Sequence, residues 1–230
     1  MTGAFYLNKD THLVAVDCII MSYHENDLYV LLAKRQFEPM KGKWSLMGGF
    51  VNKGESVNEA AGRVLDEFTG IEDIFMEQLG AYGDVERDLG ERVVSIAYYA
   101  LVDMDKFDTS CAIKYDARWM KITHLPDLIF DHSKMVKDTI KTLQRIAAVK
   151  PIGFNLLGDR FTLPVLQSLY EAIYQETIDK RNFRKKFLSM DILEKLDEKD
   201  KGSSKRGAYY YQFNKDKYDK LIQQGLHFSL

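Results

Sequence analysis

The sequence has little of what marks specialised chains. Only 2 of its 230 residues are cysteines, Cys18 and Cys111, which is too few for a disulfide scaffold and is typical of a reducing compartment. With 4 prolines and 15 glycines, the composition is neither fibrous nor disordered. No apolar run approaches the ~20 residues of a membrane span, and residues 1–14 lack the basic and then apolar order of a signal peptide. We therefore expect a soluble cytoplasmic protein with no membrane partner.

The sequence has enough apolar residues for a sizeable core, and its charged residues are unevenly distributed along the chain. The chain is 46% hydrophobic and 29% charged, and its length fits one large domain or two of ordinary size. Residues 1–150 carry 18 basic and 23 acidic side chains, whereas residues 151–230 carry 14 basic and 11 acidic ones. This polarity predicts an acidic domain over 1–150 joined to a domain over 151–230 that meets polyanions. A solvated basic face produces the same signal, so charge alone leaves both interpretations open.

Hydrophobic periodicity predicts both strands and helices in residues 1–150. Two apolar runs around a short polar turn, 13–23 and 27–35, indicate an antiparallel hairpin. A helix is expected from Ser56 to Gly70, because Ser56 and Glu59 have capping-box spacing and glycine suits a helix end. Further elements follow from the same patterns: an extended piece at 44–50, strands at 79–84, 92–102 and 115–121, and a helix from about Ser133 to Val149.

The pattern of residues 151–230 predicts a domain of a different kind. Thr162, with Pro164 in the first turn, starts an amphipathic helix, and Asp179 caps a second helix over 180–190. Two strands, 191–197 and 208–214, then flank a charged tip that contains glycine and serine. A helix, a turn, a basic helix and a two-stranded wing together form the outline of a winged helix-turn-helix domain.

Residues 49–71 resemble the Nudix box. Its pattern is Gly, five residues, Glu, seven residues, Arg-Glu, an aliphatic residue, any residue, Glu-Glu, any residue, Gly and an aliphatic residue. Seven of the 23 positions are in register: Gly49, Glu55, Arg63, Leu65, Glu67, Gly70 and Ile71. The resemblance implies an α+β chain, in which a Nudix-like α/β/α sandwich with a mixed sheet is followed by the winged helix-turn-helix domain.

The metal-binding part of this box is incomplete. In Nudix hydrolases, three glutamates on this helix collect divalent cations, but here two of those positions hold Val64 and Phe68, and Glu67 alone remains. Val64 and Phe68 lie one turn apart on the same helix face, whereas two-metal chemistry needs several rigid oxygen ligands. We therefore predict no metal, no cofactor, no catalytic residue and no enzymatic activity. Three carboxylates remain as alternative ligands, although their spacing gives no support: Asp66, Glu72 and Glu77.

Binding of a small molecule is what remains for this domain. Residues 82–98 resemble a segment of ADP-ribose-type Nudix proteins, in which a polar loop leads into a strand that lines the pocket. The side chains suited to a hydroxylated effector are Arg87, Asp88, Glu91 and Arg92 in this loop, together with Lys34, Arg35 and Trp44. A solvated hairpin tip and a core tryptophan explain the same residues equally well.

Residues 180–186 carry five basic side chains in seven positions and no acidic one. A helix places Arg181, Arg184 and Lys185 on one face, while Phe183 and Phe187 pack toward the core. Because cations pair with phosphates and Arg and Asn read base edges, we predict a recognition helix. The residues expected to contact DNA are Lys180, Arg181, Asn182, Arg184, Lys185 and Lys186 in the helix, with Lys201, Ser203, Ser204, Lys205 and Arg206 in the wing. A solvated basic helix is the alternative.

Together the two parts resemble the Nudix-related transcriptional regulators over almost the whole chain, most clearly at 87–98, 161–173 and 181–186. The likeness is closest to the sugar-responsive branch that includes the L-arabinose-responsive regulator. It implies a homodimeric repressor or activator of carbohydrate-utilisation genes, which senses a sugar and binds a near-palindromic operator in double-stranded DNA.

Two other functions stay open at this point. One is an active Nudix hydrolase of ADP-ribose-like nucleoside diphosphates, against which Val64 and Phe68 argue. The other is a non-enzymatic sensor whose basic domain binds a protein or RNA.

Overall fold

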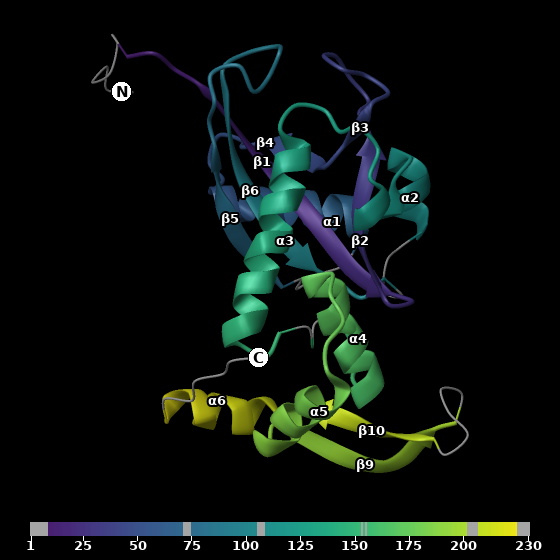
Figure 1. The fold of residues 1–230 in the computed structure, drawn as a ribbon. Coiled ribbons are helices and arrows are strands. Elements are labelled where there is room, and N and C mark those ends of the chain that lie inside the picture. Colours follow the sequence, from purple (N-terminus) through teal and green to yellow (C-terminus); the bar gives the residue numbers. More distant parts are fainter. Residues whose placement is uncertain are drawn as a thin grey trace.

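The computed structural model describes residues 9–70, 75–104, 109–152, 154, 156–201 and 207–224. In these residues a mixed sheet of seven strands follows the path β3-β2-β1-β6-β5, with β4 paired to β1 and β7 paired to β2 (Figure 1). The strands are β1 (Leu13–His24), β2 (Asp27–Lys34), β3 (Trp44–Ser45), β4 (Met47–Phe50), β5 (Met76–Tyr82), β6 (Val93–Leu101) and β7 (Arg118–Lys121).

The predicted hairpin at the start of the chain is confirmed. β1 and β2 pair antiparallel around Glu25 and Asn26, whose φ angles of 48° and 68° are those of a two-residue primed turn. β1 also pairs parallel with β6 from Leu13 to Met21, so that it lies inside the sheet. A strand buried on both faces is nearly continuously apolar, which explains why β1 lacks the alternation of a surface strand.

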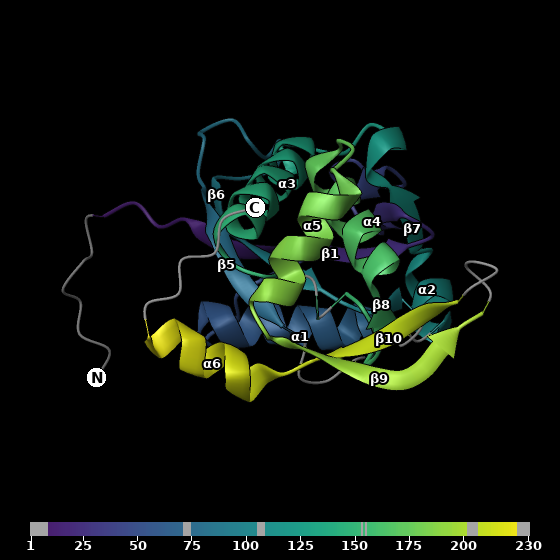
Figure 2. The same cartoon turned by 60° about the horizontal axis from the view of Figure 1, so that its bottom comes forward.

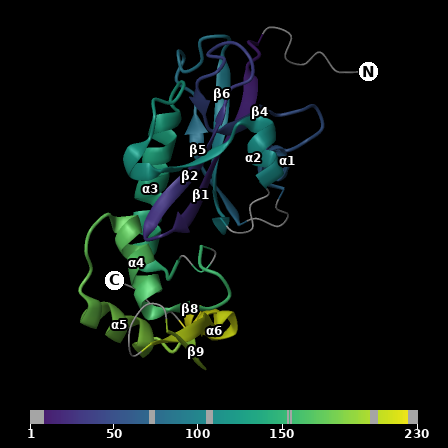
Figure 3. The ribbon, with the colours of Figure 1, turned by 90° about the vertical axis from the view of Figure 1, so that its right-hand side faces the viewer.

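Helices cover both faces of the sheet (Figure 3). α1 (Val57–Thr69) and α2 (Thr109–Tyr115) lie on one face, and α3 (His132–Val149) lies on the other. The predicted ends of α1 are confirmed, since Ser56 and Glu59 form the capping box and Gly70 takes a φ of 66°. The sandwich with a mixed sheet is therefore the observed architecture of this part.

The second part of the chain is the expected winged helix domain (Figure 2). It comprises β8 (Phe161–Thr162), α4 (Leu163–Tyr174), α5 (Lys180–Ser189), β9 (Leu193–Asp200), β10 (Ala208–Phe213) and α6 (Lys215–Gln223). Thr162 and Asp179 accept the capping bonds of α4 and α5, as predicted. The rings of Phe183 and Phe187 are buried against Tyr170, with centroids 5.4 and 5.3 Å from its ring.

Two local expectations held only in part, and two elements lay outside the expectations. Residues 109–115 form α2, so the strand expected at 115–121 is only Arg118–Lys121. The extended piece at 44–50 is interrupted at Leu46, because the Leu46 amide donates to the His132 ring instead of to a neighbouring strand. β8 and α6 were not predicted. The nine-residue α6 depends on tertiary packing, since Tyr218 and Leu221 pack against the main core.

One hydrophobic core joins the two parts. It runs from Ile19 and Met21 in the sheet through α3 to Leu166 and Phe187 in the winged domain. Hydrogen bonds reinforce this contact: the Gln144 side chain donates to the Ile173 carbonyl at 3.0 Å, and the Ser168 hydroxyl donates to the Asn26 side chain at 2.7 Å. None of the described helices is long and apolar enough to cross a membrane.

Candidate functional site

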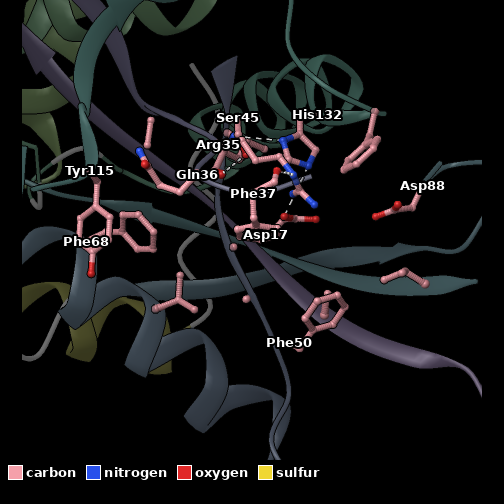
Figure 4. A pocket seen from close by; sticks show the side chains of 18 of the residues that line it. Asp17, Arg35, Gln36, Phe37, Ser45, Phe50, Phe68, Asp88, Tyr115 and His132 are labelled. Carbon is pink, nitrogen blue, oxygen red and sulfur yellow. Dashed lines mark hydrogen bonds and ion pairs between the residues drawn. The ribbon is translucent and has the colours of Figure 1, made fainter. Parts of the chain in front are cut away.

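A cavity of about 300 Å³ opens where the segment resembling the Nudix box meets the sheet (Figure 4). β1 contributes Asp17, and the end of β2 leads into Arg35, Gln36 and Phe37. The remaining walls come from distant parts of the chain, namely Gly48, Gly49 and Phe50 in β4, Val64, Glu67 and Phe68 in α1, Arg87 and Asp88 in a loop, Tyr115 in α2, and Phe130 and His132 near the start of α3.

A buried charged cluster forms the floor of this cavity. Arg87, which is 7% exposed, donates from Nε and Nη2 to the two carboxylate oxygens of Asp131 at 3.0 and 2.8 Å. Its Nη2 also donates to Asp17 at 3.2 Å. Burial by itself favours the neutral guanidine, but the bonds and charges of Asp131 and Asp17 raise the pKa of Arg87 overall. The side chain predicted as an effector contact is therefore held in place by two carboxylates.

His132 belongs to the same cluster. Its Nδ1 accepts a hydrogen bond from the Leu46 amide at 3.0 Å, which leaves the proton of the neutral ring on Nε2, 3.5 Å from Asp17. Burial lowers the pKa of His132, so the ring is neutral near pH 7. Gly48 is required beside this cluster, because a Cβ atom there would lie 2.5 Å from an Asp17 carboxylate oxygen and 2.9 Å from the Val16 carbonyl oxygen.

An ion pair joins the loop before α1 to the helix. Arg63 donates from Nε and Nη2 to the two carboxylate oxygens of Glu55 at 3.1 and 2.7 Å, and Nη2 also donates to the Phe50 carbonyl. The Asn52 amide donates to Glu55 at 2.6 Å. The Arg63 hydrogen bond is the largest cause that lowers the pKa of Glu55 to about 2. Glu55 and Arg63 thus fasten the loop to the helix.

The residues on α1 do not fit a pair of divalent cations. Val64 is 1% exposed, and the Phe68 ring lies 4.2 Å from the Tyr115 ring. One carboxylate oxygen of Glu67 accepts a hydrogen bond from the Tyr115 hydroxyl at 2.5 Å. Among the described residues, no three His, Cys, Asp or Glu side chains gather where they could hold a metal ion. Val64 and Phe68 offer no lone pair, so this donor set does not match the oxygen-rich shell that Mg²⁺ needs.

The three alternative carboxylates do not supply the missing oxygen ligands. Asp66 and Glu77 lie outside the cavity lining, and Glu77 accepts a hydrogen bond from the Tyr99 hydroxyl. Glu72 lies outside the described residues.

The structure brings together only part of the predicted effector set. Lys34, Arg35, Arg87 and Asp88 line the cavity, whereas Trp44, Glu91 and Arg92 do not. Trp44 lies in a neighbouring groove with the Lys34 ammonium 3.9 Å above its ring. Arg92 donates to the carbonyl groups of Gly83 and Asp84, which fastens its own loop.

Arg35 is the cavity residue best placed for an anionic ligand. Its Nε donates to the Phe37 carbonyl, and its guanidinium lies 4.2 Å from the Phe37 ring and 5.2 Å from the Phe130 ring. No ion pair to Arg35 or to its neighbour Lys34 is formed by the described residues. A guanidinium that lies near two rings and forms no ion pair with the described residues keeps its charge for a ligand, and it matches phosphate or carboxylate geometry.

Sequence reasoning missed several residues of this site. Asp17 sits in an apolar strand, and the partners Asp131 and His132 follow a loop more than a hundred positions later. A carboxylate in an otherwise apolar strand is a usable signal, because a buried charge is normally paired. Four of the aromatic side chains that line the cavity carry no comparable signal: Phe37, Phe50, Tyr115 and Phe130.

The basic helix α5 forms a second candidate site. Its exposed residues include Lys180, Arg181, Asn182, Arg184 and Lys185, while Lys186 is half-buried. Lys180, Arg181, Arg184 and Lys185 form no ion pair with any other described residue. The positive charge of this face is therefore not neutralised within the described chain, as an interface with phosphates requires.

The wing is described only up to its tip. Lys201 is exposed at the end of β9, whereas Ser203, Ser204, Lys205 and Arg206 lie outside the described residues. Strand β9 carries two basic residues, Lys195 and Lys199, that are not among the predicted DNA contacts. Their ammonium groups lie 3.5 and 4.4 Å from the centre of the Tyr209 ring.

Comparison with known proteins assigns both parts of the chain. Residues 11–139 match the NUDIX domain family, and residues 153–213 match the NrtR DNA-binding winged helix domain. The chain belongs to the NrtR family. It is 30% identical over 211 residues to the ADPR responsive transcriptional repressor NtrR of Acinetobacter baylyi, an alignment that covers 90% of this chain and 84% of that protein.

A solved member of the NrtR family has the same architecture throughout. Shewanella oneidensis NrtR, in a crystal structure complexed with a 27mer DNA, superposes with a TM-score of 0.80 at 28% identity, over 90% of this chain and 95% of that one. The Nudix part alone is 38% identical over 128 residues to an ADP-ribose pyrophosphatase of Methanocaldococcus jannaschii, covering 56% of this chain and 73% of that enzyme. As an NrtR protein, the chain is a transcriptional regulator with a DNA-binding winged helix domain.

Proposed function

We propose that this protein is a repressor which binds an operator through α5 and the wing, and which is controlled by an anionic sugar derivative in the Nudix cavity. The observation that carries the proposal is the face of α5, where four exposed cations have no ion pair among the described residues and two buried phenyl rings anchor the helix. A fixed helix with unneutralised charge is what a phosphate backbone attracts.

The cavity serves binding and not hydrolysis in this proposal. Val64 and Phe68 replace two oxygen ligands, and the Tyr115 hydroxyl occupies one oxygen of Glu67. A water molecule therefore lacks the cations that would activate it in a two-metal mechanism. The rival proposal, hydrolysis of ADP-ribose, draws on the likeness to the M. jannaschii enzyme and is tested by turnover with Mg²⁺ or Mn²⁺.

The chemistry of the cavity favours an effector with both a charge and a ring. Lys34 and Arg35 suit a phosphate, and the rings of Phe50, Phe68 and Tyr115 suit the face of a sugar or base. ADP-ribose has both features, and the A. baylyi repressor is ADPR responsive. Free L-arabinose, the effector predicted from the sequence, has a ring but no anion. It stays a prediction without support from this relative.

Helix α3 provides a route from the cavity to the DNA-binding domain. Its first residue, His132, and its N-cap, Asp131, belong to the charged floor of the cavity. Its last turns pack on α4, where Gln144 donates to Ile173. An effector that moves the floor can thus shift the equilibrium between two arrangements of the winged domain.

A homodimer on a near-palindromic operator completes the proposal. Two recognition helices placed one turn of DNA apart would read two half-sites, and the twofold symmetry of the dimer would match that of the operator. The homodimer, the operator symmetry and the cytoplasmic location remain predictions from the sequence.

Fluorescence anisotropy on duplexes tiled across the upstream region of the gene tests this proposal. We expect one tile to bind tightly with a steep salt dependence, and ADP-ribose to change its affinity more than L-arabinose does. Release of AMP from ADP-ribose with Mg²⁺, abolished by Glu67→Gln, would support the hydrolase instead. If RNA of unrelated sequence competed as well as the best tile, the basic domain would not be a specific DNA reader.

A further inference from the structure

The side of the cavity that faces α1 carries an aromatic wall in place of metal ligands. Phe68 from α1 and Tyr115 from α2 lie 4.2 Å apart between ring centres, tilted by 38°. Figure 4 shows both rings on one side of the cavity, away from Asp17 and His132 on its floor. Val64 extends the same apolar surface, and the Tyr115 hydroxyl is fixed by its bond to Glu67. The rings of Phe68 and Tyr115, which come from separate helices, are thus held together as one surface.

Charges of both signs surround the wall. Glu67 and Arg63 line the cavity beside it, and the Lys114 ammonium lies 4.5 Å from the centre of the Tyr115 ring, so the rings and not the charges decide what the wall accepts. Lys34 and Arg35 attract the anionic group to another part of the lining. An uncharged ring suits the wall, because bases and sugar C–H faces stack on aromatic side chains.

We infer that the effector binds without a divalent cation, and that one of its uncharged rings, a sugar or a base, stacks on the wall formed by Phe68 and Tyr115. This inference rests on the proposed function, since it assumes that the effector occupies the Nudix cavity. In this inference Val64 and Phe68, the two α1 residues that depart from the Nudix box, form part of the surface that contacts the effector.

Isothermal titration with ADP-ribose, in EDTA and in millimolar Mg²⁺, tests both halves of the inference. For the unmodified protein we expect the same Kd in the two buffers. Because stacking of one base on an aromatic ring contributes ~1–3 kcal/mol, Phe68→Ala should weaken binding roughly 5- to 150-fold. Phe68→Tyr keeps the ring and should stay within about threefold of the unmodified protein.

Two further variants separate stacking from folding. Tyr115→Phe keeps the ring but releases Glu67, so its affinity should exceed that of Tyr115→Ala. Phe75→Ala removes a partly exposed ring that packs on Tyr99 outside the cavity lining, and it should leave the affinity unchanged. Each variant should retain the operator affinity of the unmodified protein without effector, which shows that it is folded.

The outcomes are distinct. Binding that EDTA abolishes, or an affinity that Phe68→Ala leaves unchanged, overturns the inference. A loss for ADP-ribose but not for ribose 5-phosphate supports the wall and assigns it to the base, whereas a loss for both assigns it to the sugar. If ADP-ribose binds in this way but does not alter operator binding, the inference stands and the proposed effector control fails. If neither probe binds the unmodified protein, both fail.

Discussion

At the scale of single residues, the floor of the cavity is built from charges that hold one another. Arg87 bridges Asp17 and Asp131 with a side chain that is 3% exposed, and the neutral ring of His132 completes the cluster. Lys34 and Arg35 also line the cavity, and neither forms an ion pair with another described residue. In the proposed function, the cluster shapes the cavity and these two cations attract the effector.

We expect Arg87→Ala to destabilise the protein by about 3–5 kcal/mol, because it leaves two largely buried carboxylates without their cation. Urea unfolding at pH 7.5 measures the change. Arg118→Ala is the matched control, since its ion pair with Asp116 is solvent-exposed and should contribute less than about 1 kcal/mol. Equal effects of the two substitutions would show that the buried cluster does not stabilise the fold.

His132 should make the stability depend on pH in one direction. Burial lowers its pKa below the usual 6.5, so the unfolded chain binds a proton at a higher pH than the folded chain does. Its contribution is present above pH 6.5 and is lost as the pH falls below that value.

His132→Asn should therefore flatten the decline in the free energy of unfolding as the pH falls below 6.5. Asparagine offers an oxygen to the Leu46 amide but does not titrate. Urea titrations at several pH values measure the slope. If the variant and the unmodified protein decline in parallel, another group controls the acid response.

At the scale of elements, α3 joins the cavity to the winged domain. Its N-terminus contributes to the charged floor, and Gln144 near its other end donates to a carbonyl in the last turn of α4. The hydrophobic core continues across the same junction. The proposed control requires that an effector which displaces His132 also displaces α4, and a helix that spans both sites would carry such a displacement.

Gln144→Ala should weaken the coupling between effector and operator by about 0.5–2 kcal/mol, while each ligand alone binds nearly as before. Anisotropy titrations of the operator with and without saturating ADP-ribose give the coupling free energy. Thr142→Ala is the control, because Thr142 lies on the same helix and its hydroxyl accepts a hydrogen bond from Arg145 within α3. A coupling unchanged by Gln144→Ala would place the route outside this contact.

At the scale of the whole molecule, the acidic and the basic parts of the sequence belong to different domains. The basic face of α5 lies in the domain that follows the acidic Nudix part, so in the proposed function the operator and the effector bind to different domains. A regulator needs this separation, because effector and operator must bind at once for one to change the affinity of the other.

Arg184→Ala should weaken operator binding by about 1–3 kcal/mol if the guanidinium contacts a base edge, or lower the salt slope by about 1 if it contacts a phosphate. The fold should be unaffected, since Arg184 is exposed. Lys141→Ala removes an exposed charge from α3 and serves as the control. An operator affinity equal to that of the control at every salt concentration would exclude α5 as the reader.

Features that depend on neighbours in the chain could be predicted from the amino-acid sequence. The caps at Ser56, Thr162 and Asp179 appear where the sequence placed them, because a cap involves residues only three positions apart. The departures at Val64 and Phe68 are visible for the same reason, since the spacing of the Nudix box is fixed. The buried face of α5 followed from the period of a helix.

Which residues form the cavity depends on tertiary contacts. Asp17 meets Arg87 across 70 positions, and Arg87 meets Asp131 across 44, because the pairing of β1 with β6 and the packing of α3 on β1 bring separate segments together. Tyr115 meets Glu67 across 48 positions through the packing of α2 on α1. Local periodicity contains no information on such contacts, so Arg87 was recognised as important while its partners, and the aromatic wall, were not.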